Sequence, residues 1–365
     1  MAFMLTEAQR LKLLEPPRGK IRAVLDTDTF NEIDDQFALT QMLLSTDRIA
    51  TEAIYAAPFL NPRSDSPGHG MELSFQEIGR LLDRLGRPAD RFVYRGVTDF
   101  VGPTKVAQNA DAVDDLVQRA RRSTPEDPLY VIAIAAISNV ASAILKAPEI
   151  IDHIVVVWLG GHALEWADTN EFNLQQDIGG AQVLFDSGVP LVLVPCRGVV
   201  SHLVSTVPEI ERYVEPHGEI GRFLSQRFKE YAGDNQAGWS KVIWDMVAIA
   251  WLIDPDWCPS VLVPTPILTD IPTWSGDRSR HLMRYVHRID RNAIMADFFT
   301  KLQTFARSRH STQARFNAHV PPRRSQSRPA FRQYAASFQV TRAGGVHGAK
   351  PDRACGCKSR AAGPG

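Results

Sequence analysis

Apolar runs rich in β-branched residues alternate with segments of helical period between about residue 20 and residue 196. The runs cover residues 21–28, 49–58, 91–96, 129–136, 153–161 and 189–196. Most of them are apolar at successive positions, as strands covered by helices on both faces must be. The alternation of strand and helix predicts an α/β fold with an open, mostly parallel, doubly wound (Rossmann-like) sheet. Ligands of such sheets bind beyond the carboxyl ends of the strands, so the residues that follow each run are candidates for function.

Polar residues predict where several helices begin and end. Ser74 and Glu77 have the spacing of a capping box, and Asp177 and Gly188 are typical of the start and the end of one helix. Residues 197–300 are more helical, and a last strand at 280–289 leads into a helix at 292–303. We therefore expect helical insertions that close the site from residues 197–275.

Charge is distributed unevenly along the chain. The 365 residues include 41 basic and 41 acidic side chains, but residues 306–365 contain 12 basic residues and one acid, Asp352. The first 305 residues therefore hold 29 basic and 40 acidic residues, a net charge of −11. We predict an α/β domain at 1–305 and a basic, low-complexity tail at 306–365, disordered because it has too few apolar residues to offset its ordering entropy. A tail that binds RNA or an acidic partner, and a frameshifted end of the chain, are the alternatives.

Composition narrows the class of protein. With 44% hydrophobic and 22% charged residues, the chain is typical of a water-soluble globular protein. No apolar run approaches the roughly 20 residues of a membrane helix, and the N-terminus lacks the pattern of a secretion signal, so we expect a cytoplasmic protein with no membrane partner. The acidic body argues against nucleic acid as its partner. Four cysteines are too few for a disulfide framework, and Cys355 and Cys357 lack a second pair for zinc.

The main candidate for chemistry is a group of four aspartates where the first strand ends. Asp26 and Asp28 close the strand, and Asp34 and Asp35 begin the apolar helix that follows. Carboxylates so close together repel one another unless a cation lies among them, and ligands that are all oxygen favour Ca²⁺ or Mg²⁺ over zinc. The alternative is that one or two of these aspartates only cap the helix.

With these aspartates the chain resembles the nucleoside hydrolases, whose first strand ends in Asp-x-Asp followed by a short loop and an Asp-Asp pair. The resemblance covers residues 21–303. Four stretches carry it, in this order: Asp26-Thr27-Asp28 with Ile33-Asp34-Asp35; Ile137-Ser138-Asn139-Val140-Ala141; Glu171-Phe172-Asn173 followed by Gly188-Val189-Pro190; and Trp244-Asp245.

The resemblance implies a Ca²⁺-dependent hydrolase that cleaves the N-glycosidic bond of a small-molecule ribonucleoside, with a role in purine salvage. The implied ligands of Ca²⁺ are the carboxylates of Asp28, Asp35 and Asp245 and the main-chain carbonyl of Ser138. Asp28 is our candidate for the base that activates the attacking water. Three further residues are implied to bind the ribose: Asp34, Glu171 and Asn173. We also expect a homo-oligomer, either a dimer or a tetramer.

Each of these later residues also has a plain structural interpretation. Glu171 and Asn173 would face the same way from an extended segment, and an ordinary surface loop is the alternative. Asp245 begins a largely apolar helical stretch, where a lone buried carboxylate needs a partner, so the residue is either a metal ligand or a helix cap.

Three departures from the family bear on specificity. Many nucleoside hydrolases have a histidine that protonates the leaving base immediately before the last metal aspartate, but this chain has Trp244, whose indole cannot act as an acid. A tryptophan there suggests stacking on a purine-like base, with Trp166 as a possible second ring; a core tryptophan is the alternative. The usual Gly-Asn after the second strand is missing, although Asn61 lies nearby, and the loop of residues 29–32 is two residues longer. His162, after the fifth strand, is a second candidate for the acid.

Two other functions remain open at this stage. A family member that binds ribose or nucleosides but has lost turnover would account for Trp244 and the missing Gly-Asn. A haloacid-dehalogenase-like phosphatase also starts with a strand ending in Asp-x-Asp, but position 30 is Phe and no downstream Lys and paired-Asp motif is convincing.

Overall fold

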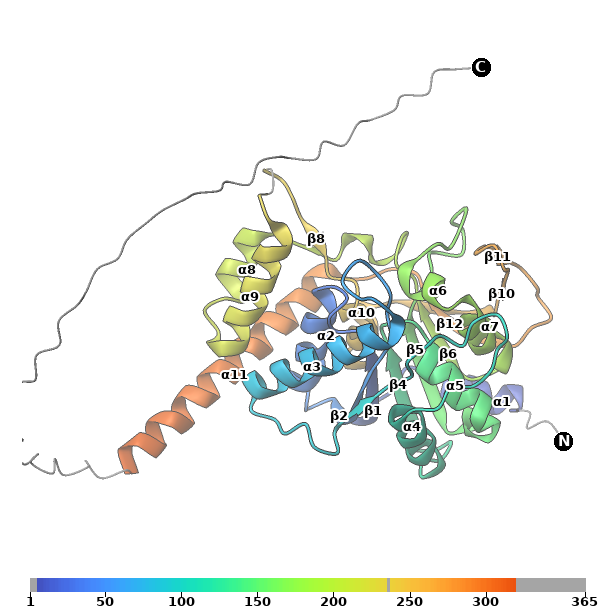
Figure 1. The fold of residues 1–365 in the computed structure, drawn as a ribbon, viewed down its shortest axis with the longest axis horizontal. Coiled ribbons are helices and arrows are strands. Elements are labelled where there is room, and N and C mark those ends of the chain that lie inside the picture. Colours follow the sequence, from blue (N-terminus) through green and yellow to red (C-terminus); the bar gives the residue numbers. More distant parts are fainter. Residues whose placement is uncertain (1–4, 235–236, 320–365) are drawn as a thin grey trace, which may run out of the picture. The chain divides into compact units, whose positions relative to one another are not determined.

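The computed structural model describes residues 5–234 and 237–319 (Figure 1). Its centre is an eight-stranded sheet with the order β3-β2-β1-β4-β5-β6-β12-β9, and every neighbouring pair is parallel except β12 and β9. The predicted α/β fold with an open, mostly parallel sheet is therefore confirmed. The strands of this sheet are β1 (Ile21–Thr27), β2 (Ile49–Ala56), β3 (Val93–Arg95), β4 (Leu129–Ala133), β5 (Ile154–Leu159), β6 (Leu191–Val194), β9 (Ser260–Pro264) and β12 (Leu282–Val286).

Helices cover both faces of the sheet, and two short antiparallel pairs lie outside it. The pairs are β7 (Val204–Ser205) with β8 (Lys241–Val242) and β10 (Ile267–Leu268) with β11 (Trp274–Ser275). The helices are α1 (Glu7–Leu13), α2 (Asp34–Leu44), α3 (Pro67–Leu85), α4 (Asp111–Arg121), α5 (Ser138–Lys146), α6 (Phe172–Gln176), α7 (Ile178–Ser187), α8 (Val207–Tyr213), α9 (Gly218–Ala232), α10 (Met246–Ile253) and α11 (Arg291–His319), with short 3₁₀ turns at Pro148–Asp152, Val200–His202 and Pro255–Trp257. Helices α8, α9 and α10 supply the helical insertion predicted for residues 197–275.

Each central strand contributes to two hydrophobic cores because its side chains alternate between the faces of the sheet. In β1, Ala23 and Leu25 belong to the core that also contains residues of α2, α3, α10 and α11. Val24, between them, belongs to the core formed with α4, α5 and α7. All three side chains are fully buried. Burial on both faces is the physical reason that the strand runs read as continuously apolar.

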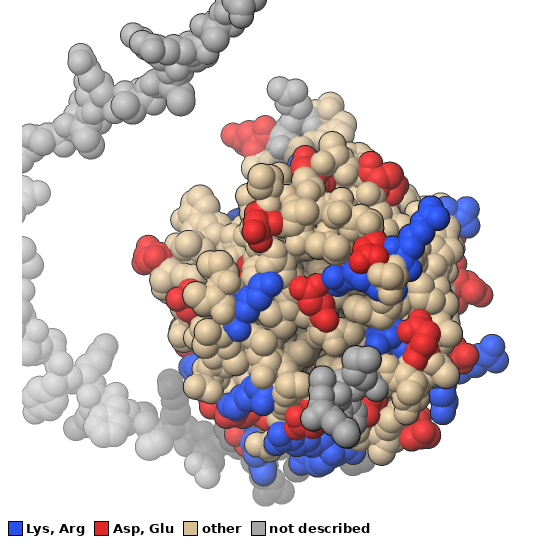
Figure 2. Space-filling model, turned by 90° about the vertical axis from the view of Figure 1, so that its right-hand side faces the viewer, with Lys and Arg blue, Asp and Glu red and all other residues tan. Residues whose placement is uncertain are grey.

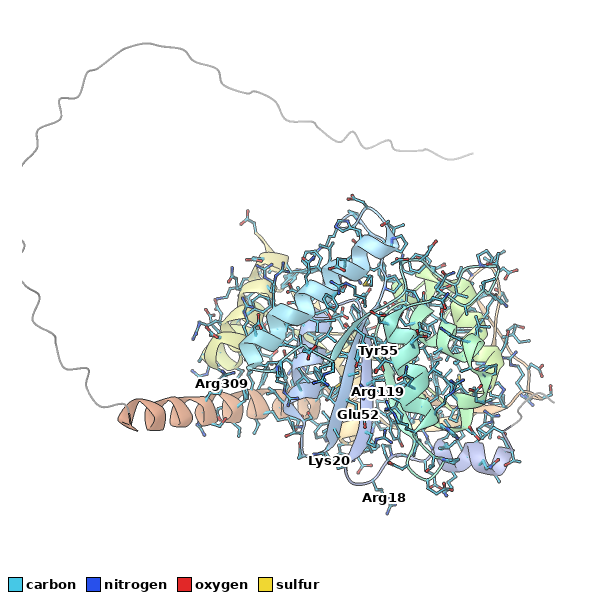
Figure 3. The ribbon with its side chains drawn as sticks, turned by 60° about the horizontal axis from the view of Figure 1, so that its bottom comes forward. Arg18, Lys20, Glu52, Tyr55, Arg119 and Arg309 are labelled. Carbon is cyan, nitrogen blue, oxygen red and sulfur yellow. The ribbon has the colours of Figure 1, made fainter. Side chains whose placement is uncertain are left out.

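A network of charged residues joins helix α4 to the sheet (Figure 3). The Arg119 guanidinium binds Asp115 at 2.6 Å and Glu52 of β2 at 3.2 Å. The Tyr55 hydroxyl donates to Asp115 at 2.8 Å, and Arg22 of β1 binds Glu52 at 2.6 Å. These groups are partly buried and paired with one another, so the helix can lie on the sheet without leaving a charge unpaired.

Two sequence predictions about helix starts have different outcomes. Helix α7 begins after Asp177, whose side chain accepts from the Gly180 amide, and ends at Gly188 with φ +77°, as predicted. The capping box predicted at Ser74 and Glu77 is wrong, because both residues are buried inside α3. The Glu77 carboxylate instead accepts from Gln36 of α2 at 3.0 Å. Ser74 and Glu77 thus have the sequence spacing of a cap, although Glu77 makes a polar contact between two helices.

Helix α11 continues beyond the end that the sequence predicted for it. The helix reaches His319, whereas the apolar pattern stops near residue 303, and the compact unit that contains the sheet covers Met1–Asn317. Residues 306–319 of the predicted tail are therefore helical. Residues 320–365 lie outside the described part of the chain, and the division into a domain and a disordered tail stays a prediction.

Candidate active site

A cavity of about 430 Å³ opens beyond the carboxyl ends of the central strands, where the doubly wound fold predicts a ligand site. Its walls come from segments far apart in the chain: the turn after β1, the start of α2, the loops after β2, β4 and β5, and the residues before α10. The lining residues are Asp28, Asn31, Glu32, Asp34, Asp35, Asn61, Arg63, Ile134, Leu159, Glu171, Phe172, Asn173, Cys196, Tyr231, Trp244 and Asp245.

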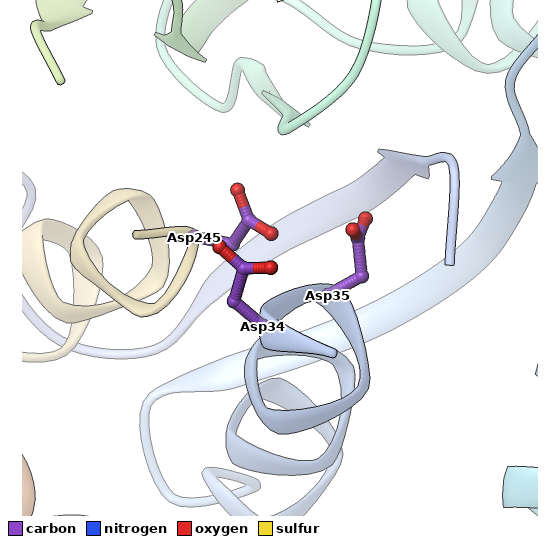
Figure 4. Close-up of side chains that lie close together, drawn as sticks. All are labelled: Asp34, Asp35 and Asp245. Atoms are coloured by element: carbon purple, nitrogen blue, oxygen red, sulfur yellow. The ribbon is translucent and has the colours of Figure 1, made fainter. Parts of the chain in front are cut away.

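Three aspartates of this wall converge on one point (Figure 4). Asp34 and Asp35 are the first two residues of α2, and Asp245 immediately precedes α10. Each offers one carboxylate oxygen, and these oxygens lie within 4.8 Å of one another. The Thr27 hydroxyl at the end of β1 donates to Asp35 at 2.5 Å and helps to fix its orientation. Such a cluster of oxygen ligands could hold a divalent cation.

Asp28 lies in the same cavity but is not one of these three converging residues. It directly follows β1 and is 1% exposed, and neither of its carboxylate oxygens has a hydrogen-bond partner among the described residues. The same is true of one oxygen of Asp34. Buried carboxylate oxygens are expensive to leave unpaired, so these atoms need a proton, a cation or a ligand.

The electrostatics of the cluster point the same way. Burial raises the pKa of Asp28, Asp34 and Asp245 well above 3.8, and the charges of neighbouring carboxylates raise it further, although the Lys241 ammonium opposes the shift of Asp34. Burial raises the pKa of Asp35 to about 7, although its hydrogen bonds oppose the shift. Without a cation the cluster therefore favours protonation near neutral pH. On the face shown in Figure 2, acidic and basic side chains are interspersed, whereas the buried cluster brings carboxylates together.

The helix-cap alternatives for these aspartates find no support in the local geometry. The residue before α2 is Ile33, and no side chain caps that helix. Asp245 occupies the cap position of α10, but its side chain makes no capping hydrogen bond. These carboxylates line the cavity and accept no capping hydrogen bond from the free amides of α2 or α10.

Asp34 also contacts residues of the helical insertion. One of its oxygens accepts from the backbone amide of Trp244 at 3.2 Å and lies 3.9 Å from the Lys241 ammonium. Lys241 is only 8% exposed and also binds Glu32 at 2.8 Å. The sequence does not indicate that Lys241 and Glu32 form an ion pair at this cavity, because the two positions are separated by 209 residues and leave no local pattern.

Glu171 and Asn173 also line the cavity and lie at the start of α6, with Glu171 as the residue that caps this helix. Both Glu171 oxygens accept from backbone amides, of Asn173 at 3.0 Å and of Leu174 and Gly161 at 3.0 and 2.9 Å. The Asn173 amide donates to the Leu159 carbonyl at 3.0 Å. The two residues are 8% and 5% exposed, so they are not part of the ordinary surface loop considered as the alternative. Each keeps acceptor capacity toward the cavity.

The main-chain carbonyl of Ser138 stays a predicted metal ligand. Ser138 is the buried first residue of α5, it is not among the residues that line the cavity, and its hydroxyl donates to Asp177 at 2.6 Å. The residue of this segment that does line the cavity is Ile134, immediately after β4.

Other candidates are divided between the cavity and its surroundings. Asn61 lines the cavity and donates to Asn31 at 2.7 Å, so it lies where the sequence allowed a replacement for the missing Gly-Asn. His162 and Trp166 are not among the lining residues, and their rings pack against each other with centroids 6.5 Å apart. Trp244 does line the cavity, together with Tyr231. The other aromatic residues that line the cavity with Trp244 are therefore Tyr231 and Phe172, and Trp166 is not among them.

No helix among the described residues is long and apolar enough to cross a membrane.

The chain is similar to known proteins in sequence and in fold. Curated relatives include the pyrimidine-specific ribonucleoside hydrolases RihA of Klebsiella pneumoniae and Escherichia coli K12, each 29% identical over 182 residues, which are 48% of this chain. The match spans only about half, 54%, of the length of those relatives.

Solved structures share the fold. A purine-preferring ribonucleoside hydrolase from Gardnerella vaginalis has a TM-score of 0.62 at 20% identity, covering 78% of this chain and 99% of that one. A plant nucleoside hydrolase has the same TM-score and coverage at 16% identity.

Residues 69–332 match the family described as inosine-uridine preferring nucleoside hydrolase. The aspartates that follow β1 precede this segment, while Glu171, Asn173 and Asp245 lie within it. Members of the family hydrolyse the N-glycosidic bonds of nucleosides, and the match argues against the phosphatase alternative. On this evidence, the chain belongs to the inosine-uridine preferring nucleoside hydrolase family.

Proposed function

We propose that the protein is a Ca²⁺-dependent hydrolase that cleaves ribonucleosides, with purine-like bases favoured, into ribose and free base. The observation that carries the proposal is the set of buried, unpaired carboxylate oxygens of Asp28 and Asp34 in a cavity that is also lined by Trp244. Such a cavity offers acceptors for a cation and a sugar diol together with an aromatic side chain for a base.

The residues present fit a divalent cation. We assign Asp28, Asp35 and Asp245 as its carboxylate ligands and the carbonyl of Ser138 as its main-chain ligand, with the carbonyl of Ile134, which lines the cavity, as the alternative. Asp28 is chosen over Asp34 because both Asp28 oxygens are unpartnered among the described residues, whereas Asp34 already faces the Lys241 ammonium and the Trp244 amide. Several carboxylate and carbonyl oxygens in one site favour Ca²⁺, which accepts more ligands and a less regular geometry than Mg²⁺.

When bound, the cation would neutralise the aspartates and lower the pKa of a water in the site. Asp28 is the proposed general base that removes a proton from the attacking water. Asp34 is proposed to accept hydrogen bonds from the ribose hydroxyls through its unpartnered oxygen, with Glu171 and Asn173 holding the far side of the sugar. Hydrolysis of the bond passes through a state resembling an oxocarbenium ion, which these carboxylates would stabilise electrostatically.

Trp244 determines what kind of leaving group the site can use. Its indole cannot protonate a departing base, so we propose that it stacks on the base and that solvent water supplies the proton to a ring nitrogen of the base. The proposal of a purine-like base rests on this role. The names of the relatives do not agree on the base, since the curated ones are pyrimidine-specific and one solved structure is purine-preferring.

The test is to measure free ribose released from inosine, guanosine, adenosine, uridine and cytidine, with Ca²⁺ and after chelation. We expect release that depends on Ca²⁺ and is fastest with a purine nucleoside. Faster release from uridine or cytidine would refute the purine preference, and release that survives complete chelation would refute the metal requirement. Thermal stabilisation by nucleosides without any ribose release would refute turnover and support a family member that only binds.

A role in purine salvage and assembly into a dimer or tetramer stay predictions that follow from the resemblance, and a cytoplasmic location stays a prediction from the sequence pattern.

A further inference from the structure

Three residues at the mouth of the cavity form a linked group that the proposed chemistry does not use. Glu32, in the loop between β1 and α2, accepts from the Tyr231 hydroxyl at 2.8 Å and binds the Lys241 ammonium at 2.8 Å. The same ammonium lies 5.3 Å from the centre of the Tyr231 ring. Tyr231 is near the end of α9 and Lys241 begins β8, so the group joins the β1–α2 loop to the helical insertion.

Two residues of the group belong to the same cavity as the assigned stacking residue: Glu32 and Tyr231 both line the cavity, as does Trp244. The Lys241 ammonium that holds Glu32 is also 3.9 Å from Asp34, whose other contact at this oxygen is the Trp244 amide. Through this ammonium the Glu32 carboxylate is linked to the carboxylate assigned to the sugar, so it lies within the part of the cavity that a bound nucleoside would occupy.

We propose that Glu32 recognises the leaving base: its carboxylate accepts a hydrogen bond from a ring N–H, and this contact favours bases with such a group, as in hypoxanthine and guanine. The inference rests on the proposed function, because it needs a ribonucleoside in this cavity.

The chemistry of the group supports this assignment. A carboxylate is an acceptor only, and each oxygen of Glu32 has a second lone pair beyond the one used by Tyr231 or Lys241. Burial by itself would raise the pKa of Glu32, but Lys241 and the Tyr231 hydroxyl lower it, so the side chain is held as the anion. A hydrogen bond to a fixed anion is stronger and more directional than one to a neutral acceptor.

Pre-organisation is the second argument. Long acidic side chains lose conformational freedom when they bind a ligand, and that loss weakens the interaction. Glu32 is already held on both oxygens by partners from a different part of the chain. Lys241 and Tyr231 therefore act as positioning residues, which keep the Glu32 carboxylate in place at the cavity wall.

The test compares inosine with purine riboside, which has the same ring system but no ring N–H to donate in its six-membered ring. Both the rate constant kcat/KM for ribose release and the binding of each nucleoside are measured for the wild type and for Glu32→Gln. We expect the wild type to favour inosine by tenfold or more, as for a hydrogen bond to a charged group, and Glu32→Gln to lose most of that preference. Equal use of the two nucleosides by the wild type, or an unchanged preference in Glu32→Gln, would overturn the inference.

Two further variants test the positioning residues without removing the carboxylate. Tyr231→Phe removes one hydroxyl, and Lys241→Met removes the ammonium but keeps most of the side-chain volume. Both should reduce the preference for inosine through a higher KM, and Lys241→Arg should restore part of it. Lys229→Met is the matched control, because Lys229 pairs with Glu211 and Glu215 outside the cavity. A loss of preference in the control equal to that in Lys241→Met would count against the positioning role, and thermal unfolding of every variant shows whether it is folded.

The binding measurement separates this inference from the proposed function. A wild type that binds inosine more tightly than purine riboside through Glu32, yet releases no ribose, would refute hydrolysis and retain base recognition. A wild type that hydrolyses both nucleosides equally would retain hydrolysis and refute base recognition.

Discussion

Replacing Asp35 by Asn should have different effects on stability in the absence and in the presence of Ca²⁺. Asp35 is fully buried in a cluster of carboxylates, and burial raises its pKa from 3.8 to about 7 in the metal-free protein. Asparagine has a similar shape and no charge. The variant therefore removes the cost of burying a charge at position 35, and it also removes one proposed ligand of the cation.

The magnitude follows from the shift in pKa. Between about pH 4 and pH 7 the folded protein retains a proton on Asp35 that the unfolded chain has lost. The contribution of Asp35 to the free energy of unfolding is therefore greatest below pH 4 and is lost as the pH rises through the folded pKa. A shift of about three units at 1.36 kcal/mol per unit corresponds to an upper limit of about 4 kcal/mol for this group. In chelator, the stability of the wild type relative to Asp35→Asn should fall by up to about that amount between pH 4 and pH 7.

Calcium at high concentration should offset this electrostatic cost at neutral pH. A cation that binds only the folded state stabilises it by about 4.1 kcal/mol when its concentration is 1,000 times its dissociation constant. The wild type should gain this stabilisation, and Asp35→Asn should gain much less.

The assay is urea unfolding followed by tryptophan fluorescence, in chelator and in Ca²⁺, over this pH range. Asp114→Asn on helix α4 is the control, because the Asp114 side chain is 54% exposed and pairs with Lys146 at the surface. If the free energy of unfolding in chelator depends on pH in the same way for the wild type and Asp35→Asn, the raised pKa of Asp35 is refuted. An equal gain from Ca²⁺ in both proteins would refute Asp35 as a ligand.

Three other substitutions test separate parts of the structure. Asp28→Asn should lower kcat by at least a hundredfold, because it removes the proposed base, and a near-normal rate of ribose release would remove Asp28 from that role. Trp244→Ala should lower kcat/KM for purine nucleosides more than for nitrophenyl ribosides, whose leaving group needs no help; equal losses would argue against stacking on the base. Gly179→Ala should destabilise the fold by about 2 kcal/mol or more in urea unfolding, because the new methyl group would lie 1.8 Å from the Gly102 carbonyl oxygen, and an unchanged unfolding midpoint would contradict this packing.

The sequence determined the class of fold and the location of the site. Strands such as β1 were predictable because burial on both faces leaves a continuous apolar run, and the start and end of α7 were predictable because Asp177 and Gly188 act on their own neighbours. The aspartates after β1 were predictable for a similar reason: carboxylates a few residues apart at a strand end must lie close together in any fold.

Tertiary structure decided the partners of individual side chains. Ser74 and Glu77 have the spacing of a cap, but Glu77 contacts Gln36 of another helix. Ser138 belongs to a family motif, but the motif does not indicate that its hydroxyl donates to Asp177. Glu32 and Lys241 show no pattern in the sequence, and their ion pair exists only because the helical insertion folds back over the first loop. Local periodicity reports which face of an element is buried; it contains no information about which distant residue a polar side chain will meet, since that depends on how whole elements pack.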